Sequence, residues 1–314
     1  MVINIGLILL SLALLYGGAS GLVNGASSLA IKLGLTPLVI GLTIVAFGTS
    51  TPELIVSVQA ALQGNSGIAV GNVVGSNIFN IGVILGVSAL CYPIMVKAEI
   101  LRTDVPVMLA TAVLFTLLFI DHTIGRGEGL LLVASSIAYT LYIIIQARKA
   151  TNSEVTNEFE EGIPKRRTWW MDALLIMVGL ATLMVGSRLL VDNAVSLAKL
   201  YQVSDAVIGL TIVAAGTSMP ELATSVVAAL KKQSDIALGN VVGSNIYNIL
   251  AILGVSSVIT PIYSPDIALT DSLVMVGISF LLLPLVKTGF ILKRWEGALL
   301  LSFFLVYLYT LLAV

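Results

Sequence analysis

Two glutamates stand directly after prolines inside apolar stretches of this sequence. The stretch beginning at residue 41 reads GLTIVAFGTSTPEL and the one beginning at residue 209 reads GLTIVAAGTSMPEL, so that 12 of 14 positions match. Proline lacks an N–H and crowds the carbonyl four residues back, so each proline is expected to disturb the helix just before it. A loose carbonyl or a lone carboxylate is unfavourable in an apolar environment. A cation bound near Glu53 and Glu221 would satisfy both groups.

A second repeated motif supplies further oxygen donors. GNVVGSNIFN begins at residue 71 and GNVVGSNIYN at residue 239, and they match at 9 of 10 positions. Residues three and four apart share a face of a helix. That spacing groups Thr49 and Ser50 with Glu53, Thr217 and Ser218 with Glu221, Asn72 with Ser76 and Asn80, and Asn240 with Ser244 and Asn248. Oxygen donors without histidine or cysteine favour hard cations such as Ca²⁺ or Na⁺ over zinc or copper.

The elements that carry these motifs must lie in a membrane. The sequence is 58% hydrophobic and only 11% charged, which is typical of an integral membrane protein. Its net charge of −1 gives no sign of a nucleic-acid partner, and its single cysteine, Cys91, excludes an internal disulfide. A span needs about 20 apolar residues. We predict an all-α polytopic protein with ten spans at 2–23, 37–62, 67–92, 104–120, 128–147, 170–191, 205–230, 236–260, 268–286 and 295–313.

Both motif pairs are separated by the same offset of 168 residues, which indicates a duplicated chain. We expect a first half at 1–147, a polar linker at 148–169 and a second half at 170–314. Each half holds five predicted spans, and because five is odd the second half enters the membrane from the opposite side. Inverted repeats with broken helices at matching positions are typical of secondary transporters with a site near the midplane.

The lysines and arginines predict the orientation. If the loops alternate sides, 13 of the 16 lie on the side that holds the linker and three on the side of the termini. By the positive-inside rule the linker is cytoplasmic, and both termini of this cell-membrane protein face outward.

These motifs resemble the two alpha-repeats of the sodium/calcium exchanger family, in its prokaryotic form without regulatory calcium-binding domains. The resemblance implies that spans 2, 3, 7 and 8 form the ion-binding core and that the long tilted spans 1 and 6 slide past it. It also implies a set of metal ligands made of side-chain oxygens and two main-chain carbonyls: Glu53, Glu221, Thr49, Ser50, Thr217, Ser218, Ser76, Asn80, Ser244 and Asn248, with the carbonyls of Ala46 and Ala214.

One position departs from the family pattern. Well-known exchangers carry an aspartate where this chain has Asn248, and potassium-dependent relatives also use aspartate in this motif. The two asparagines therefore argue against potassium co-transport, and they leave two fixed carboxylates in the site.

The resulting hypothesis is an antiporter that exchanges Na⁺ for Ca²⁺ by alternating access, is electrogenic and exports Ca²⁺. Its expected partners are these ions and the lipid bilayer, with no cofactor and no obligatory protein partner. An H⁺/Ca²⁺ antiporter using the same glutamates remains the alternative, and sodium dependence at clamped pH separates the two. A cation channel would need no counter-ion. An intramembrane enzyme would need histidines or a nucleophile with a base inside the spans, and the predicted spans of this sequence contain neither.

Overall fold

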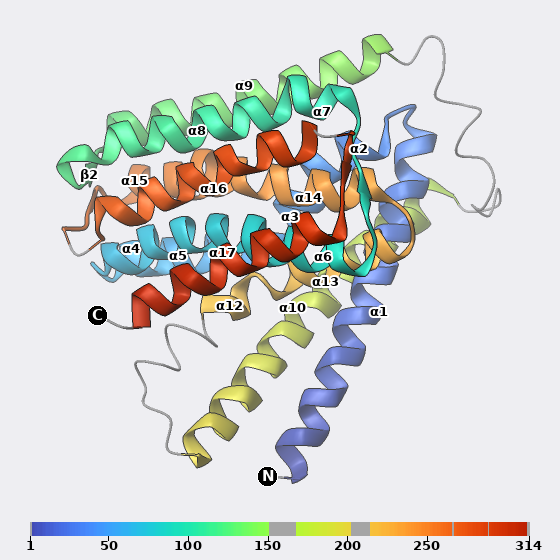
Figure 1. The fold of residues 1–314 in the computed structure, drawn as a ribbon, viewed down its shortest axis with the longest axis horizontal. Coiled ribbons are helices and arrows are strands. Elements are labelled where there is room, and N and C mark those ends of the chain that lie inside the picture. Colours follow the sequence, from blue (N-terminus) through green and yellow to red (C-terminus); the bar gives the residue numbers. More distant parts are fainter. Residues whose placement is uncertain (1, 151–167, 202–213, 266, 288, 313–314) are drawn as a thin grey trace.

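The computed structural model describes residues 2–150, 168–201, 214–265, 267–287 and 289–312, and these are almost entirely helical (Figure 1). In the first half the elements are α1 (Val2–Lys32), α2 (Pro37–Ile40), η1 (Gly41–Val45), α3 (Ala46–Thr49), α4 (Thr51–Leu62), α5 (Ser66–Phe79), η2 (Asn80–Leu85), α6 (Gly86–Cys91), β1 (Ile94–Met95), α7 (Ala98–Arg102), α8 (Asp104–Leu118), η3 (Phe119–Asp121), β2 (Thr123–Ile124) and α9 (Arg126–Ala150). In the second half they are α10 (Trp169–Leu200), α12 (Ala214–Thr217), α13 (Met219–Leu230), α14 (Ser234–Tyr247), η5 (Asn248–Leu253), α15 (Gly254–Ile259), β3 (Ile262–Tyr263), α16 (Leu269–Lys287), β4 (Ile291–Leu292) and α17 (Arg294–Leu312).

Central elements of the two halves have matching bounds. Helices α4, α5 and α6, with the π-helical η2, recur as α13, α14, α15 and η5 after the same 168 residues that separate the motifs. Within an apolar stretch of 18 residues in each continuous rod, Ser66–Cys91 and Ser234–Ile259, 78% of the residues are buried, whereas only 28% are buried in such a stretch of α1 or α10. The second motif of each half therefore lies at the centre of the bundle.

Seven helices among the described residues are long and apolar enough to cross a membrane, or eight if the bent pair Pro37–Thr49 and Thr51–Leu62 counts as one span. The described residues thus form a multi-pass membrane protein, while the count of ten stays a prediction. The seventh predicted span falls partly on residues 202–213, and most of the predicted linker falls on 151–167. Both segments lie outside the described residues.

The predicted break at the first proline is confirmed. Helix α3 ends at Thr49, Ser50 leaves the helical conformation with φ −80° and ψ 9°, and α4 starts at Thr51 with Pro52 in its first turn. The two segments meet at a bend of 45°. Ser218 has nearly the same conformation before Pro220, with φ −88° and ψ 8°. Each break leaves a single serine between the end of one short helix and the start of the next.

The first and sixth helices are longer than predicted. The spans 2–23 and 170–191 continue as helix to Lys32 and Leu200. The extension of α1 contains Ser27 and Ser28, which are 4% and 1% exposed. Packing against neighbouring helices sustains this part of α1, which hydropathy alone does not detect.

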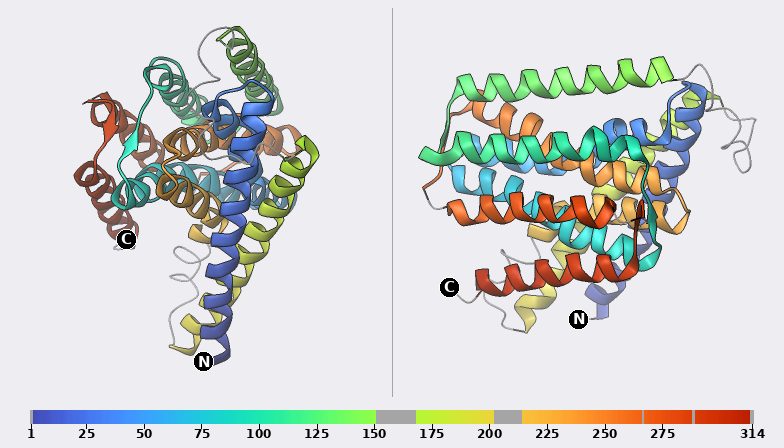
Figure 2. Two further views of the ribbon diagram at one scale, coloured as in Figure 1. Left: turned by 90° about the vertical axis from the view of Figure 1, so that its right-hand side faces the viewer. Right: turned by 45° about the horizontal axis from the view of Figure 1, so that its top comes forward.

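Helices α1 and α10 run side by side at a steep angle to the other helices (Figure 1), and their ends project from the bundle (Figure 2). Glycines allow this close contact, because a Cβ on Gly179 would lie 2.8 Å from the carbonyl oxygen of Gly18. Near the other end of the pair, Lys32 forms a salt bridge with the fully buried Asp172. Lys231 ties α13 to α1 through hydrogen bonds to Ser20 Oγ and Asn24 Oδ1, at 2.6 and 2.8 Å.

The fold is mostly helical, as predicted, and the described residues also contain four two-residue strands. Strand β1 pairs with β4 and β2 pairs with β3, both antiparallel. Each pair joins a loop of the first half to a loop of the second. These short pairings satisfy main-chain groups where the chain turns between helices, a demand that apolar periodicity does not reveal.

Candidate ion-binding site

The two glutamates lie together at the helix breaks. Glu53 and Glu221 are each 1% exposed, although they are the most polar side chains of their segments. Each accepts a hydrogen bond from the serine at the break of the opposite half: Ser50 Oγ donates to Glu221 Oε1 and Ser218 Oγ donates to Glu53 Oε1, both at 2.9 Å. The duplication therefore places both carboxylates in one cluster, each oriented by the other repeat.

The serines of the second motif join this cluster. Ser50 Oγ lies 3.0 Å from Ser244 Oγ, and Ser218 Oγ lies 3.3 Å from Ser76 Oγ. Ser244 Oγ also lies 3.5 Å from the main-chain oxygen of Ala46. The four predicted serines thus connect the two glutamate helices to the two central rods.

Four buried side-chain oxygens, on the two glutamates and on two asparagines of the second motif, have no hydrogen-bond partner among the described residues. They are Glu53 Oε2, Glu221 Oε2, Asn80 Oδ1 and Asn248 Oδ1. Buried polar atoms are normally paired, so each such atom calls for an explanation. Neither glutamate forms an ion pair with any basic residue in the described ranges, so no side-chain cation there offsets the two buried carboxylates.

The two predicted threonines each contact an asparagine of the opposite half. Thr49 Oγ1 donates to Asn240 Oδ1 at 3.1 Å and to the main-chain oxygen of Ala46 at 3.3 Å. Thr217 Oγ1 contacts Asn72 Oδ1 at 3.5 Å. Ala214 is the first residue of α12 and follows directly on the segment that the structure does not describe.

Asn72 and Asn240, which belong to the predicted polar stripes, support the glutamates through the main chain. Asn72 Nδ2 donates to the carbonyl of Glu53 at 3.1 Å and to Ser57 Oγ at 2.9 Å. Asn240 Nδ2 makes the corresponding bonds to the carbonyl of Glu221 at 3.3 Å and to Ser225 Oγ at 2.9 Å. These amides fasten each broken helix to the neighbouring rod.

Sequence reasoning missed two further amides, Asn77 and Asn245. Both are 1% exposed and bond to the side chains of Asn248 and Asn80. Each stands directly after the motif serine, but neither falls on the four-residue stripe that singled out its neighbours. Their presence in both motif copies was the signal that could have found them.

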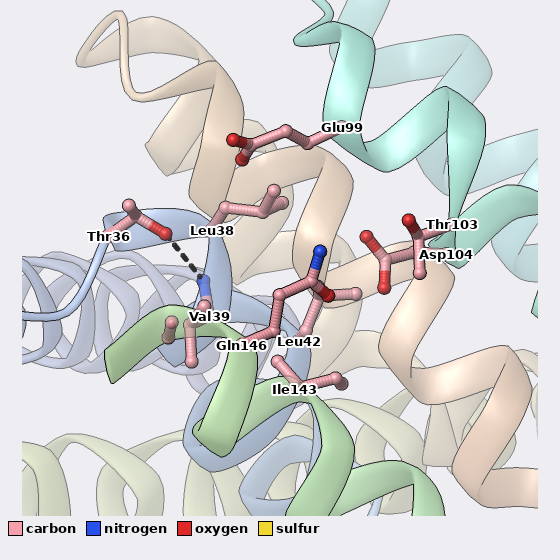
Figure 3. A pocket seen from close by; sticks show the side chains of 10 residues that line it. Thr36, Leu38, Val39, Leu42, Glu99, Thr103, Asp104, Ile143 and Gln146 are labelled. Atoms are coloured by element: carbon pink, nitrogen blue, oxygen red, sulfur yellow. Dashed lines mark hydrogen bonds between the residues drawn. The ribbon is translucent and has the colours of Figure 1, made fainter. Parts of the chain in front are cut away.

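A cavity of about 70 Å³ lies elsewhere, between α2, the α7–α8 corner and α9 (Figure 3). Its lining includes Thr36, Glu99, Asp104 and Gln146, and none of the predicted ligands. Tyr139 donates to Asp104 Oδ1 at 3.0 Å, so the buried carboxylate at this cavity already has a partner. The cavity is therefore separate from the glutamate cluster, in which one oxygen of each carboxylate has no partner among the described residues.

Comparisons with known proteins show similarity over almost the whole chain. The family model described as sodium/calcium exchanger protein matches residues 3–146 and 171–313. The chain is 40% identical to the putative antiporter CaxA of Alkalimonas amylolytica over 97% of each chain. It is 36% identical to the sodium/calcium exchanger MaX1 of Methanosarcina acetivorans over 98% of each. Among solved structures, the sodium-calcium exchanger NCX_Mj soaked with zero Na⁺ and Ca²⁺ has a TM-score of 0.85 at 33% identity, covering 99% of this chain and 100% of that one.

Proposed function

This chain belongs to the sodium/calcium exchanger protein family, and from that membership we propose that it exchanges Na⁺ for Ca²⁺ across the membrane by alternating access. It is a membrane transporter and not an enzyme. The related NCX_Mj has been studied after soaking with Na⁺ and Ca²⁺ together and with Na⁺ and Sr²⁺. These are the cations that the buried oxygens of this chain would bind.

The observation that carries the proposal is the set of four unpartnered oxygens on Glu53, Glu221, Asn80 and Asn248. Ca²⁺ takes about 6–8 oxygen ligands, so hydroxyls and carbonyls must complete its shell. The proposed ligands are the two glutamates, the hydroxyls of Thr49, Ser50, Ser76, Thr217, Ser218 and Ser244, the amide oxygens of Asn80 and Asn248, and the carbonyls of Ala46 and Ala214. Serine hydroxyls that now bond to one another can rotate toward a cation.

The charge of the site favours obligatory exchange. With both glutamates ionised the empty cluster carries a charge of about −2, which is costly to move through a low-dielectric barrier. One Ca²⁺ or two Na⁺ cancel that charge, and a third Na⁺ leaves the site with one positive charge. Loaded states therefore cross more easily than the empty state, and a transporter of this kind exchanges ions and does not leak them.

The finer features of the proposal follow from sequence and charge. We propose ten spans in two inverted halves, with both termini outside and the linker in the cytoplasm. Inward movement of three Na⁺ would then export one Ca²⁺ and carry one net positive charge inward. Asn248, where family members carry aspartate, keeps the number of carboxylates in the site at two.

The alternative is an H⁺/Ca²⁺ antiporter that uses the same two glutamates. Protons would neutralise the empty cluster as well as sodium does. We favour sodium because a serine hydroxyl contacts each carboxylate, and neutral hydroxyl oxygens suit a coordinated metal ion.

The test is Ca²⁺ uptake into Na⁺-loaded proteoliposomes, with pH clamped by an ionophore and the membrane voltage set independently. We expect uptake that requires internal Na⁺ and rises when the voltage favours outward movement of positive charge. Uptake that ignores Na⁺ and follows a pH gradient would instead establish the proton-coupled alternative.

A further inference from the structure

Asn80 and Asn248 can serve as ligands only in one of their two amide orientations. The oxygen and the amino group of an asparagine side chain have nearly the same shape. A cation is bound by the oxygen and repelled by the partial positive charge of the amino group. Both side chains are 1% exposed, so bulk water does not select between the orientations. Some other group must select them.

Asn77 provides that selection for Asn248. Its Nδ2 lies 3.2 Å from the main-chain oxygen of Asn245 and 3.5 Å from Met275 Sδ. Both of these atoms are acceptors only, so the amino group of Asn77 must face them and its oxygen must face the other way. That oxygen accepts a hydrogen bond from Asn248 Nδ2 at 3.0 Å. Asn248 therefore has its amino group bonded and its Oδ1 unpartnered within the described residues.

The second half of the chain repeats the same arrangement. Asn245 Nδ2 lies 3.4 Å from the main-chain oxygen of Asn77 and 3.6 Å from Met108 Sδ, which are again acceptors. The oxygen of Asn245 then accepts from Asn80 Nδ2 at 2.9 Å. Asn80 Oδ1 is likewise left unpartnered in the part of the chain that the structure describes.

We infer that Asn77 and Asn245 are positioning residues, whose fixed amide orientation turns the oxygens of Asn248 and Asn80 toward the ion. The inference rests on the proposed function, because it concerns two of the proposed ligands. Each pair acts across the two halves, with Asn77 setting Asn248 and Asn245 setting Asn80.

The crossing pairs allow a matched experiment. Asn77→Leu removes the acceptor that holds Asn248, and we expect the Ca²⁺ KM of Na⁺-driven uptake to rise by about 5- to 100-fold, the usual effect of leaving a buried polar group unpaired. Aspartate carries oxygen on both arms and needs no orientation. Asn248→Asp should therefore abolish the effect of Asn77→Leu, with the double variant within about threefold of Asn248→Asp alone. Asn80→Asp adds the same charge but leaves the amide of Asn248 in place, whose orientation still depends on Asn77. Asn77→Leu should therefore still weaken Ca²⁺ binding in the Asn80→Asp background.

The corresponding variants of the Asn245–Asn80 pair test the same inference in the other half of the chain. They also keep it testable if the Asn77 variants do not fold. Asn245→Leu should be suppressed by Asn80→Asp and not by Asn248→Asp. Calorimetric titration of the purified variants with Ca²⁺ in Na⁺-free buffer provides the same comparison where added charge stops transport. Equal losses in both aspartate backgrounds, or no loss on removing either asparagine, would overturn the inference.

The binding titration also separates this inference from the proposed function. A wild-type protein that binds Ca²⁺ but shows no Na⁺-driven uptake would refute the exchange activity. The Ca²⁺ affinities of the leucine variants in the two aspartate backgrounds would still test whether Asn77 and Asn245 position the ligands.

Discussion

Replacing either buried glutamate with glutamine should abolish Ca²⁺ exchange while keeping the local structure. In Glu53→Gln the new side chain has nearly the same size, and its oxygen still accepts the hydrogen bond that Ser218 Oγ now donates at 2.9 Å. The amino group, however, replaces the unpartnered Oε2, and the site loses one negative charge. The Ca²⁺-loaded site then carries one net positive charge where it was neutral before.

The size of this effect follows from the depth of the site. An uncompensated charge at the centre of a membrane protein costs at least about 2.5–3.5 kcal/mol on the lenient insertion scales. Because each 1.4 kcal/mol is a factor of ten, this corresponds to a loss of about 60- to 300-fold in Ca²⁺ exchange rate or affinity. One Na⁺ still neutralises the altered site, so movement of Na⁺ should survive. The glutamine variants are therefore expected to separate the two ions.

The assay is Ca²⁺ uptake and ²²Na⁺ exchange in the same proteoliposomes, for Glu53→Gln and Glu221→Gln. Glu99→Gln is the matched control, since Glu99 is an exposed carboxylate at the separate cavity and should leave both fluxes unchanged. Near-normal Ca²⁺ exchange in either variant, with correct reconstitution, would refute the assignment of the site. An equal loss in the control would show that the assay responds to carboxylates in general.

Three further predictions concern helix contacts and the charge of the site. Lys32→Met leaves the fully buried Asp172 without its salt-bridge partner and should lower the free energy of unfolding by about 3 kcal/mol, which a thermal melt would show as a fall of about 5 °C in Tm. The double variant Lys32→Met, Asp172→Asn should regain most of the lost stability. Gly179→Leu should separate α1 from α10 and reduce exchange, because a Cβ there would lie 2.8 Å from a main-chain oxygen. A Cβ on Gly17 meets nothing within 4 Å, so Gly17→Leu should be silent in the same uptake assay. Asn248→Asp should exchange Ca²⁺ at low pH and lose activity as pH rises, because ionisation leaves the Ca²⁺-loaded site with a net charge of −1; uptake that stays flat with pH would contradict this.

Much of the candidate site could be predicted because its signals depend on residue type and on near neighbours in the sequence. Proline breaks a helix through its own ring and missing N–H, so Pro52 alone predicts the bend that separates α3 from α4. A glutamate in an apolar stretch must find a partner whatever the fold. The repeat then doubled each signal, and burial of Glu53 and Glu221 to 1% exposure agrees with that prediction.

Helix lengths and loop pairings were less accessible. The last part of α1 is polar enough to fall outside a hydropathy window, yet Ser27 and Ser28 pack inside the bundle. Its end is fixed by Lys32 and Asp172, which are 140 residues apart in sequence. The strand pairs β1–β4 and β2–β3 likewise join opposite halves, so neither strand shows a partner in its own neighbourhood.

The sequence by itself determined which residues carry oxygen donors at helical spacing and that these residues occur twice, because residue type and the spacing along a helix are local properties. Only the tertiary structure decided how the two copies meet. It placed Ser50 on Glu221 and Ser218 on Glu53, and it set Asn77 against Asn248 with acceptors behind it. These contacts join residues 165 to 171 positions apart, where spacing carries no information. The direction in which a buried amide points depends on the donors and acceptors around it, and those neighbours are defined only when the two halves pack together.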